Sequence, residues 1–325
     1  MSAENHITLR TFASLIYSVC YGGAAGVVVF FFTSGYIITY VLQSESTKEF
    51  VIKRIFRIYP LYIFAVIIET ALQHFHDGTA LPPLTTLAAK FLLIGDFTET
   101  PYSLNGVEWT LRIEIMFYAF MAILKYIGMF KHIKFLPYVF IACTIYLYVS
   151  APFPNWVEWS SGYMNLYGPF LFVGSLILLI EKNLSNRTIC ITSIVLIFLL
   201  FYLRTAEANP GLKETNHAII ALSIFLAGWI YKSKIHANRT IKLLSEMTFS
   251  VYLFHSWLIR YIREPVEAVI STPLISEALS FAILFLWCYL TCKLIENRGV
   301  LLGRLFLPSK DRPLDTLLNK DTVKA

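Results

Sequence analysis

Residues 24–43 read AAGVVVFFFTSGYIITYVLQ and contain no charged side chain. An α-helix needs about 20 mostly apolar residues to cross the ~30 Å hydrocarbon core of a bilayer. Similar runs recur along almost the whole chain, of which 57% of the 325 residues are hydrophobic and 15% are charged. An ordinary soluble domain has about 25% charged residues. The sequence therefore predicts an all-α fold, a polytopic integral-membrane helical bundle without a separate soluble domain.

Counting the apolar runs predicts about ten transmembrane helices and one short re-entrant segment. The re-entrant segment is 84–97, which carries Lys90 and Asp96 and is too short to cross unaided. The ten expected spans are 9–22, 24–43, 56–75, 107–124, 135–151, 163–181, 189–203, 216–231, 246–262 and 276–294. We therefore expect one membrane domain over 1–308 and a charged cytoplasmic tail over 309–325.

The distribution of lysine and arginine predicts the orientation in the membrane. The link after the second run is rich in cations, whereas the link 74–86 contains no lysine or arginine. By the positive-inside rule the first link is cytoplasmic and the second is outside, which places both termini in the cytoplasm. On the same rule 125–134 is inside and 151–162 is outside. The net charge of +6 therefore reflects topology, and we expect no nucleic-acid partner.

Three arginines, Arg10, Arg54 and Arg57, lie at the predicted cytoplasmic face. Arg54 and Arg57 are three residues apart and share one side of a helix. Two guanidinium groups on one side can clamp a phosphate or a carboxylate. The alternative is that these arginines only extend to the membrane interface, and spacing alone favours this alternative.

The stretch VEWTLRIEIMFYAF (107–120) carries three charges into a predicted span. Glu108 and Arg112 are four residues apart, so we expect them to pair structurally near the interface. Glu114 lies deeper, where a carboxylate costs about 2.5–3.5 kcal/mol. It should therefore face the bundle interior with a partner, either for function or for helix pairing.

One histidine, His255, falls near the middle of the predicted span 246–262. Neutral imidazole is tolerated in lipid and can act as a general base near neutral pH, although such a histidine can also simply bond a neighbouring helix. The pair His74 and His76 is weak as a metal site, and we expect no metal.

Five stretches, taken together and in this order, resemble the motifs of the acyltransferase 3 family, which consists of integral-membrane enzymes that acylate sugars of surface polysaccharides. They are GVVVFFFTSGYIIT (26–39), RIFRIYP (54–60), EWTLRIEIMFY (108–118), SVYLFHSWLI (250–259) and LIENRGVLLGR (294–304). Ser34 and Gly35, in the first of them, are read as small residues that allow close helix approach.

The resemblance implies transfer of an acyl group, commonly acetyl, from cytoplasmic acyl-CoA to a hydroxyl of a polysaccharide or lipid-linked sugar. It implies acyl-CoA as donor substrate with no bound cofactor, a carbohydrate acceptor, membrane lipid around the chain, and the inner (plasma) membrane of a bacterial cell. The residues it assigns are Arg10, Arg54 and Arg57 for the CoA phosphates, Glu114 as a catalytic residue near the acceptor, and Trp109 and Tyr118 as residues that bind the acceptor.

The chain departs from the family pattern at the histidine expected in the first span, where the spacing from Arg10 reaches Tyr21. Tyrosine, with an ordinary pKa near 10, is a poor base at neutral pH, so His255 is the other candidate. The alternative function is a non-catalytic membrane relative, a transport or accessory subunit in polysaccharide assembly. An ion-driven transporter ranks last, because only Glu114 is a convincing buried carboxylate.

Overall fold

The computed structural model describes residues 23–156, 161–208, 216–234, 236 and 238–307, and every regular element in this part of the chain is a helix. The chain divides into two compact units. The first comprises 1–45, 92–102 and 108–238, and the second comprises 46–91, 103–107 and 239–325. The predicted span 9–22, with Arg10 and Tyr21, and the predicted tail 309–325 lie outside the described residues.

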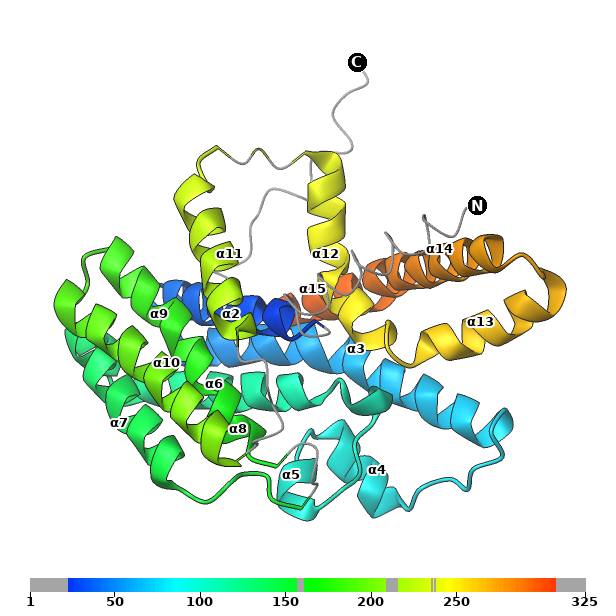
Figure 1. Ribbon diagram of the computed structural model, residues 1–325, viewed down its shortest axis with the longest axis horizontal. Helices are drawn as coiled ribbons and strands as arrows, with labels where there is room; N and C mark the ends of the chain where they lie inside the picture. The colour runs from blue at the N-terminus through cyan, green and yellow to red at the C-terminus, as the bar shows by residue number, and fades with distance from the viewer. Residues whose placement is uncertain (1–22, 157–160, 209–215, 235, 237, 308–325) are drawn as a thin grey trace. The chain divides into compact units, whose positions relative to one another are not determined.

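The first unit is built around α2, which packs against α9 and α11, while α9 packs on α10 and α10 on α7 (Figure 1). Its helices are α2 (Ala24–Val41), α5 (Gly95–Thr98), α6 (Trp109–Tyr126), η3 (Met129–Phe135), α7 (Leu136–Val149), α8 (Tyr163–Tyr167), α9 (Pro169–Glu181), α10 (Arg187–Ala208) and α11 (His217–Tyr231). The most enclosed of these is α9, with eleven consecutive buried residues from Pro169 to Leu179.

Glycines bring α2 and α9 into backbone contact. A Cβ added at Gly35 would lie 1.8 Å from the carbonyl oxygen of Leu171, and one added at Gly174 would lie 1.8 Å from that of Phe32. Both distances are far inside van der Waals contact, so only glycine fits at either position. This close approach is the use of small residues that helix packing in membranes requires.

The second unit is organised by the long helix α3, which packs against α15, η5 and α4, while α14 packs against α12 and α13. Its helices are α3 (Thr47–Phe75), α4 (Leu84–Phe91), η2 (Leu104–Gly106), α12 (Arg239–Phe254), α13 (Leu258–Val269), α14 (Pro273–Thr291), the π-helical turn η5 (Cys292–Glu296) and α15 (Asn297–Leu305). Ser46 begins α3 as an N-cap, because its hydroxyl accepts a bond from the Glu49 N–H.

Within the described residues, six helices are long and apolar enough to cross a membrane. They are Ala24–Val41, Thr47–Phe75, Met129–Val149, Tyr163–Glu181, Arg187–Ala206 and Pro273–Leu305. On α10, an exposed row of large apolar side chains repeats every four residues, comprising Ile191, Val195, Leu199 and Leu203. Such a row is unfavourable in water and suited to lipid, and the protein is an integral membrane protein.

The predicted count of ten spans is only partly met. The predicted span 216–231 corresponds to the shorter apolar helix α11. The predicted span 107–124 corresponds to α6, which is not among the six because it carries three charged side chains, Arg112, Glu114 and Lys125. The prediction of one continuous span over 246–262 is wrong, because α12 ends at Phe254 and α13 begins at Leu258. The segment 84–97 forms the short helix α4 and the start of α5.

The break between α12 and α13 has a local cause in side chains that take the last carbonyl groups of α12. The His255 Nδ1 lies 2.8 Å from the carbonyl oxygen of Tyr252, and the Trp257 Nε1–H donates to that of Leu253 at 2.8 Å. Side chains that bond nearby carbonyl groups compete with continuation of the helix. The sequence carries no glycine or proline here, so the usual signal of a helix end is missing.

Candidate functional site

The Glu114 carboxylate lies in the interior of the first unit with only 4% of the residue exposed. Its Oε1 accepts a hydrogen bond from the Ser34 hydroxyl at 2.5 Å and another from the Tyr118 hydroxyl. The expectation that Glu114 faces inward with a partner is confirmed, while its catalytic role stays a prediction. Sequence reasoning assigned Ser34 to packing and missed this bond, because the two residues are 80 positions apart.

Trp109 lies five residues before Glu114 on α6 and belongs to an aromatic cluster. Its ring centroid is 6.2 Å from that of Phe31, 5.4 Å from that of Tyr163 and 5.2 Å from that of Tyr167. Trp109 and Tyr118, the two residues predicted to bind the acyl acceptor, lie on the same helix as Glu114. All three belong to the family-like stretch 108–118. Aromatic walls of this kind line many small-molecule sites.

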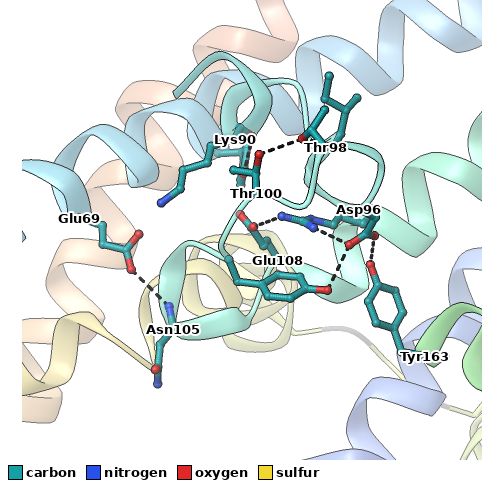
Figure 2. Close-up of polar contacts among 12 residues, drawn as sticks. Glu69, Lys90, Asp96, Thr98, Thr100, Asn105, Glu108 and Tyr163 are labelled. Atoms are coloured by element: carbon teal, nitrogen blue, oxygen red, sulfur yellow. Dashed lines mark hydrogen bonds and ion pairs between the residues drawn. The ribbon is translucent and has the colours of Figure 1, made fainter. Parts of the chain in front are cut away.

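A buried ion network occupies the start of α6 (Figure 2). Arg112, only 1% exposed, binds Asp96 through Nη1 at 2.6 Å and Glu108 through Nη2 at 2.5 Å. The Tyr163 hydroxyl donates to the other oxygen of Asp96, and the guanidinium lies 4.3 Å from the ring centroid of Tyr102. The predicted Glu108–Arg112 pair is thus confirmed, and both residues are fully enclosed by the protein.

Asp96 is the charged member of this network that sequence reasoning did not connect to it. It lies in the short helix α5, within the segment predicted as re-entrant, and is buried. A Cβ at the preceding Gly95 would lie 2.4 Å from the Arg112 Nη2, so glycine at position 95 lets the guanidinium reach the carboxylate. The charge of Asp96 in an apolar stretch was the available signal, because a buried carboxylate requires a cation.

The second unit holds the other described candidates. Arg54 is half-buried, with its guanidinium carbon 5.4 Å from the Phe50 ring centroid, and Arg57 is exposed. Arg57 is close enough to Glu296 of η5 to interact electrostatically, and that carboxylate is buried. The arginine therefore has a partner within the protein besides any ligand, and Glu296 belongs to the last of the five family-like stretches.

His255 is exposed and lies in the turn after α12, so the expectation that it sits inside one continuous helix over 246–262 is wrong. A carbonyl oxygen can only accept, so the contact with Tyr252 makes Nδ1 the protonated nitrogen of the neutral ring. Nε2 then carries the lone pair, and no described residue forms a hydrogen bond with it in the structure. A general base that acts through Nε2 requires this tautomer, because only an unprotonated nitrogen can accept a proton.

A further buried carboxylate, Glu69 on α3, was missed by sequence reasoning, so Glu114 is not the only convincing one. Glu69 accepts the backbone N–H of Asn105 at 3.3 Å (Figure 2), and the Asn105 amide donates to the Ser256 hydroxyl at 2.9 Å. Leu104 and Asn105 have positive φ angles of 55° and 53°. Glu69 thus holds the strained turn at Leu104 and Asn105 in place, and this turn contacts Ser256, the neighbour of His255 in the chain.

Comparison with known proteins relates these positions to a family. The model of the acyltransferase domain family, acyltransferase 3, matches residues 2–293. A putative acetyltransferase, ORF330, of Acidianus two-tailed virus is 25% identical over 270 residues, which cover 76% of this chain and 76% of that protein. An uncharacterized protein of Haemophilus influenzae is 30% identical over 192 residues, covering 49% of this chain and 76% of that protein.

Peptidoglycan O-acetyltransferase OatA of Listeria monocytogenes is 24% identical in an alignment 327 residues long, gaps included, which covers 87% of this chain and 52% of OatA. The chain therefore spans about half the length of OatA. No solved structure matches. Because the family model extends over nearly the whole chain and includes Ser34, Trp109, Glu114 and Tyr118, the protein belongs to the acyltransferase 3 family and is an acyltransferase of the class that transfers groups other than aminoacyl groups.

Proposed function

We propose that this protein is a membrane O-acyltransferase that moves an acyl group, acetyl in the simplest case, from cytoplasmic acyl-CoA to a hydroxyl of a surface polysaccharide or a lipid-linked sugar. Family membership supports the reaction class, and the name of OatA supports a carbohydrate acceptor. The proposed location is the inner membrane of a bacterial cell, as the family resemblance implies, and the distribution of cations places both termini in the cytoplasm.

The observation that carries the proposal is the Glu114 carboxylate, buried and already accepting hydrogen bonds from two hydroxyl groups. A sugar hydroxyl is a donor of the same type. In a water-poor site, a fixed carboxylate acceptor orients such a hydroxyl and polarises its O–H bond without solvent reorganisation. Trp109 and Tyr118 on the same helix would contact the sugar.

The reaction requires one base and one acid. The hydroxyl oxygen attacks the thioester carbonyl carbon, the carbon–sulfur bond breaks, and the proton of the hydroxyl passes through the base to the leaving sulfur, which departs as the CoA thiol. A positioned base contributes about 10²–10⁴-fold. We assign that role to His255 through Nε2, with Glu114 and Tyr21 as the other candidates.

On the donor side, Arg54 and Arg57, with Arg10, would bind the CoA phosphates. Charge-assisted contacts to phosphate are worth about 1.5–3 kcal/mol each. Arg57→Ala and Arg54→Ala should therefore each raise the acyl-CoA concentration needed for transfer while the protein stays in the membrane at normal levels. Lys48→Ala, an exposed cation at the start of the same helix, is the matched control.

The function is tested on the product in cells. Surface polysaccharide from cells with and without the protein is compared by NMR for ester-linked acyl groups, and mild alkali should remove those groups. Glu114→Gln should abolish the ester signal, whereas Glu267→Gln, the same change at a half-exposed carboxylate, should not. If wild-type cells show no ester that depends on the protein, the non-catalytic accessory role replaces this proposal.

A further inference from the structure

The first unit contains a pocket of about 400 Å³ at the end where α2, α6 and α9 terminate. The residues around it come from four segments, namely the turn after α2, the end of α6, η3 and the link between α9 and α10, and its polar side chains are those of Gln43, Lys125 and Lys131. No carboxylate is among the described residues that line it. A volume of several hundred Å³ is typical of a small-molecule site rather than of a lone ion.

Lys125 is held in place at this pocket by two groups of the protein. Its Nζ donates to the carbonyl oxygen of Leu42 at 2.6 Å and lies 5.4 Å from the ring centroid of Phe130. The Leu42 carbonyl belongs to the C-cap of α2, where the helix dipole favours a cation. An ammonium group has three N–H donors, so one bond to Leu42 leaves donors for a ligand.

A second contact fixes the wall of the pocket. The Ser185 hydroxyl donates to the carbonyl oxygen of Lys134 at 2.8 Å, which ties the α9–α10 link to the end of η3. Leu184, the residue before Ser185, lines the pocket. The cavity is thus formed before any ligand enters, which lowers the ordering cost of binding.

We infer that this pocket binds the phosphate group of an anionic ligand. The two ammonium groups supply only donors and positive charge, which suits an anion rich in acceptors, and lysine binds phosphate as a point charge. The Gln43 carboxamide, whose Nε2 donates to the carbonyl oxygen of Thr39 at 3.3 Å, has a second N–H for the same ligand. Lysines that serve topology alone can be accommodated at the interface by extending into water, whereas Lys125 is half-buried and tethered beside a cavity. The phosphate can belong to a membrane lipid headgroup or to a soluble molecule such as a nucleotide, and the inference does not depend on acyl transfer.

The experiment measures binding to the purified full chain and has one arm for each source. In the soluble arm, inorganic pyrophosphate is titrated into protein in neutral detergent at low salt. In the lipid arm, the protein is reconstituted in nanodiscs of phosphatidylcholine mixed with phosphatidylglycerol. After the protein is released from the nanodiscs, native mass spectrometry counts the phosphatidylglycerol molecules that stay bound to it. We expect Lys125→Gln and Lys131→Gln each to weaken binding about tenfold in at least one arm, as expected for loss of a charge-assisted contact.

Lys134→Gln is the matched control, because Lys134 is an exposed cation of η3 that does not line the pocket. Its affinity should equal that of the wild type in both arms. The unfolding midpoint of each variant, measured without ligand, shows whether the substitution disturbs folding. If Lys125→Gln does so, Lys131→Gln still tests the inference, because Lys131 is exposed. Equal binding by Lys131→Gln and Lys134→Gln in both arms, or no binding by the wild type in either, would overturn the inference.

Discussion

Arg112 is the residue whose loss should most disturb the first unit, because it neutralises two enclosed carboxylates. Removing the cation from a buried ion pair costs about 3–5 kcal/mol, since the buried carboxylates left behind have no cation to neutralise their charge. We expect Arg112→Ala to lower the free energy of unfolding by about that amount, or to prevent accumulation in the membrane. The measurement is denaturant unfolding in detergent.

A compensated variant separates this effect from loss of side-chain volume. Adding Asp96→Asn and Glu108→Gln to Arg112→Ala removes the unpaired charges and should recover most of the lost stability. If the triple variant is no more stable than Arg112→Ala, packing and not charge explains the effect. The exposed Arg187 provides a neutral reference for the same substitution.

The exposed cluster around Asp77 should respond to pH. Bonds from the Tyr261 hydroxyl and from His76, together with Arg260, lower the pKa of Asp77 from the usual 3.8 to about 2. A carboxylate with a lowered pKa stabilises the fold above its unfolded pKa and loses that contribution as the pH falls through the folded value. The difference in unfolding midpoint between wild type and Asp77→Asn should therefore be constant above about pH 5 and should shrink progressively as the pH falls toward 2. A difference that is unchanged at pH 2 would contradict this.

Residue pairs were predictable where they are local. The spacing of Glu108 and Arg112 on one helix indicates their contact, and the cost of a carboxylate in a span indicates that Glu114 faces inward. The bond from Ser34 to Glu114 and the contact between Asp96 and Arg112 join different segments. Side-chain spacing carries no information about such partners, because tertiary packing decides them.

At the scale of elements, the contact between α2 and α9 gives a sharp stability test. Gly35→Ala and Gly174→Ala each place a methyl group against a backbone carbonyl that cannot rotate away, so we expect a loss of about 1–3 kcal/mol or more. Gly228→Ala on α11 meets nothing within 4 Å and should be neutral or stabilising by about 0.5–1 kcal/mol. Thermal unfolding in detergent compares the three, and equal midpoints would refute the backbone contact.

The turn between α12 and α13 carries the activity prediction for His255. We expect His255→Ala to lower acyl transfer at least about tenfold, and His255→Gln to do no better, because glutamine keeps a hydrogen bond without basicity. Transfer is measured as ester formation per amount of membrane protein. Full transfer by His255→Ala together with none by Tyr21→Phe would move the role of base to Tyr21.

Elements were predictable in proportion to the uniformity of their apolar runs. The runs that became α2, α3 and α9 are long and free of charges through most of their length, and the structure has helices there. The break after Phe254 was not predictable from turn residues, because it depends on the side chains of His255 and Trp257 bonding the carbonyl groups behind them. Hydropathy does not predict helix termini that are set by such side-chain bonds to the backbone.

For the molecule as a whole, the orientation of α7 in the membrane is open to direct measurement. Lys134→Cys precedes this helix on the predicted cytoplasmic side, and Asn155→Cys follows it on the predicted outer side; both positions are exposed. In intact cells, a membrane-impermeant thiol reagent should label only Asn155→Cys, and after permeabilisation it should label both. The wild type gives the background from native cysteines. The opposite pattern would reverse the predicted topology.

The family and the reaction class of the whole molecule were more predictable than its organisation. Five short stretches in family order indicated the acyltransferase 3 family, which the match over 2–293 confirms. The division into two units, each assembled from segments distant in sequence, was not predictable, because apolar residues in lipid carry no preference for one helix partner over another.

The glycine contact between α2 and α9 also restricts which substitutions this protein can accept in evolution and which segments it can exchange with a relative. Every other amino acid carries a Cβ, so each substitution of Gly35 or Gly174 places an atom against a main-chain oxygen of the facing helix. A substitution at either glycine therefore forces α2 and α9 further apart. In a chimera with a relative, α2 and α9 should therefore be exchanged together as one cassette, although 127 residues lie between Val41 and Pro169 in the chain.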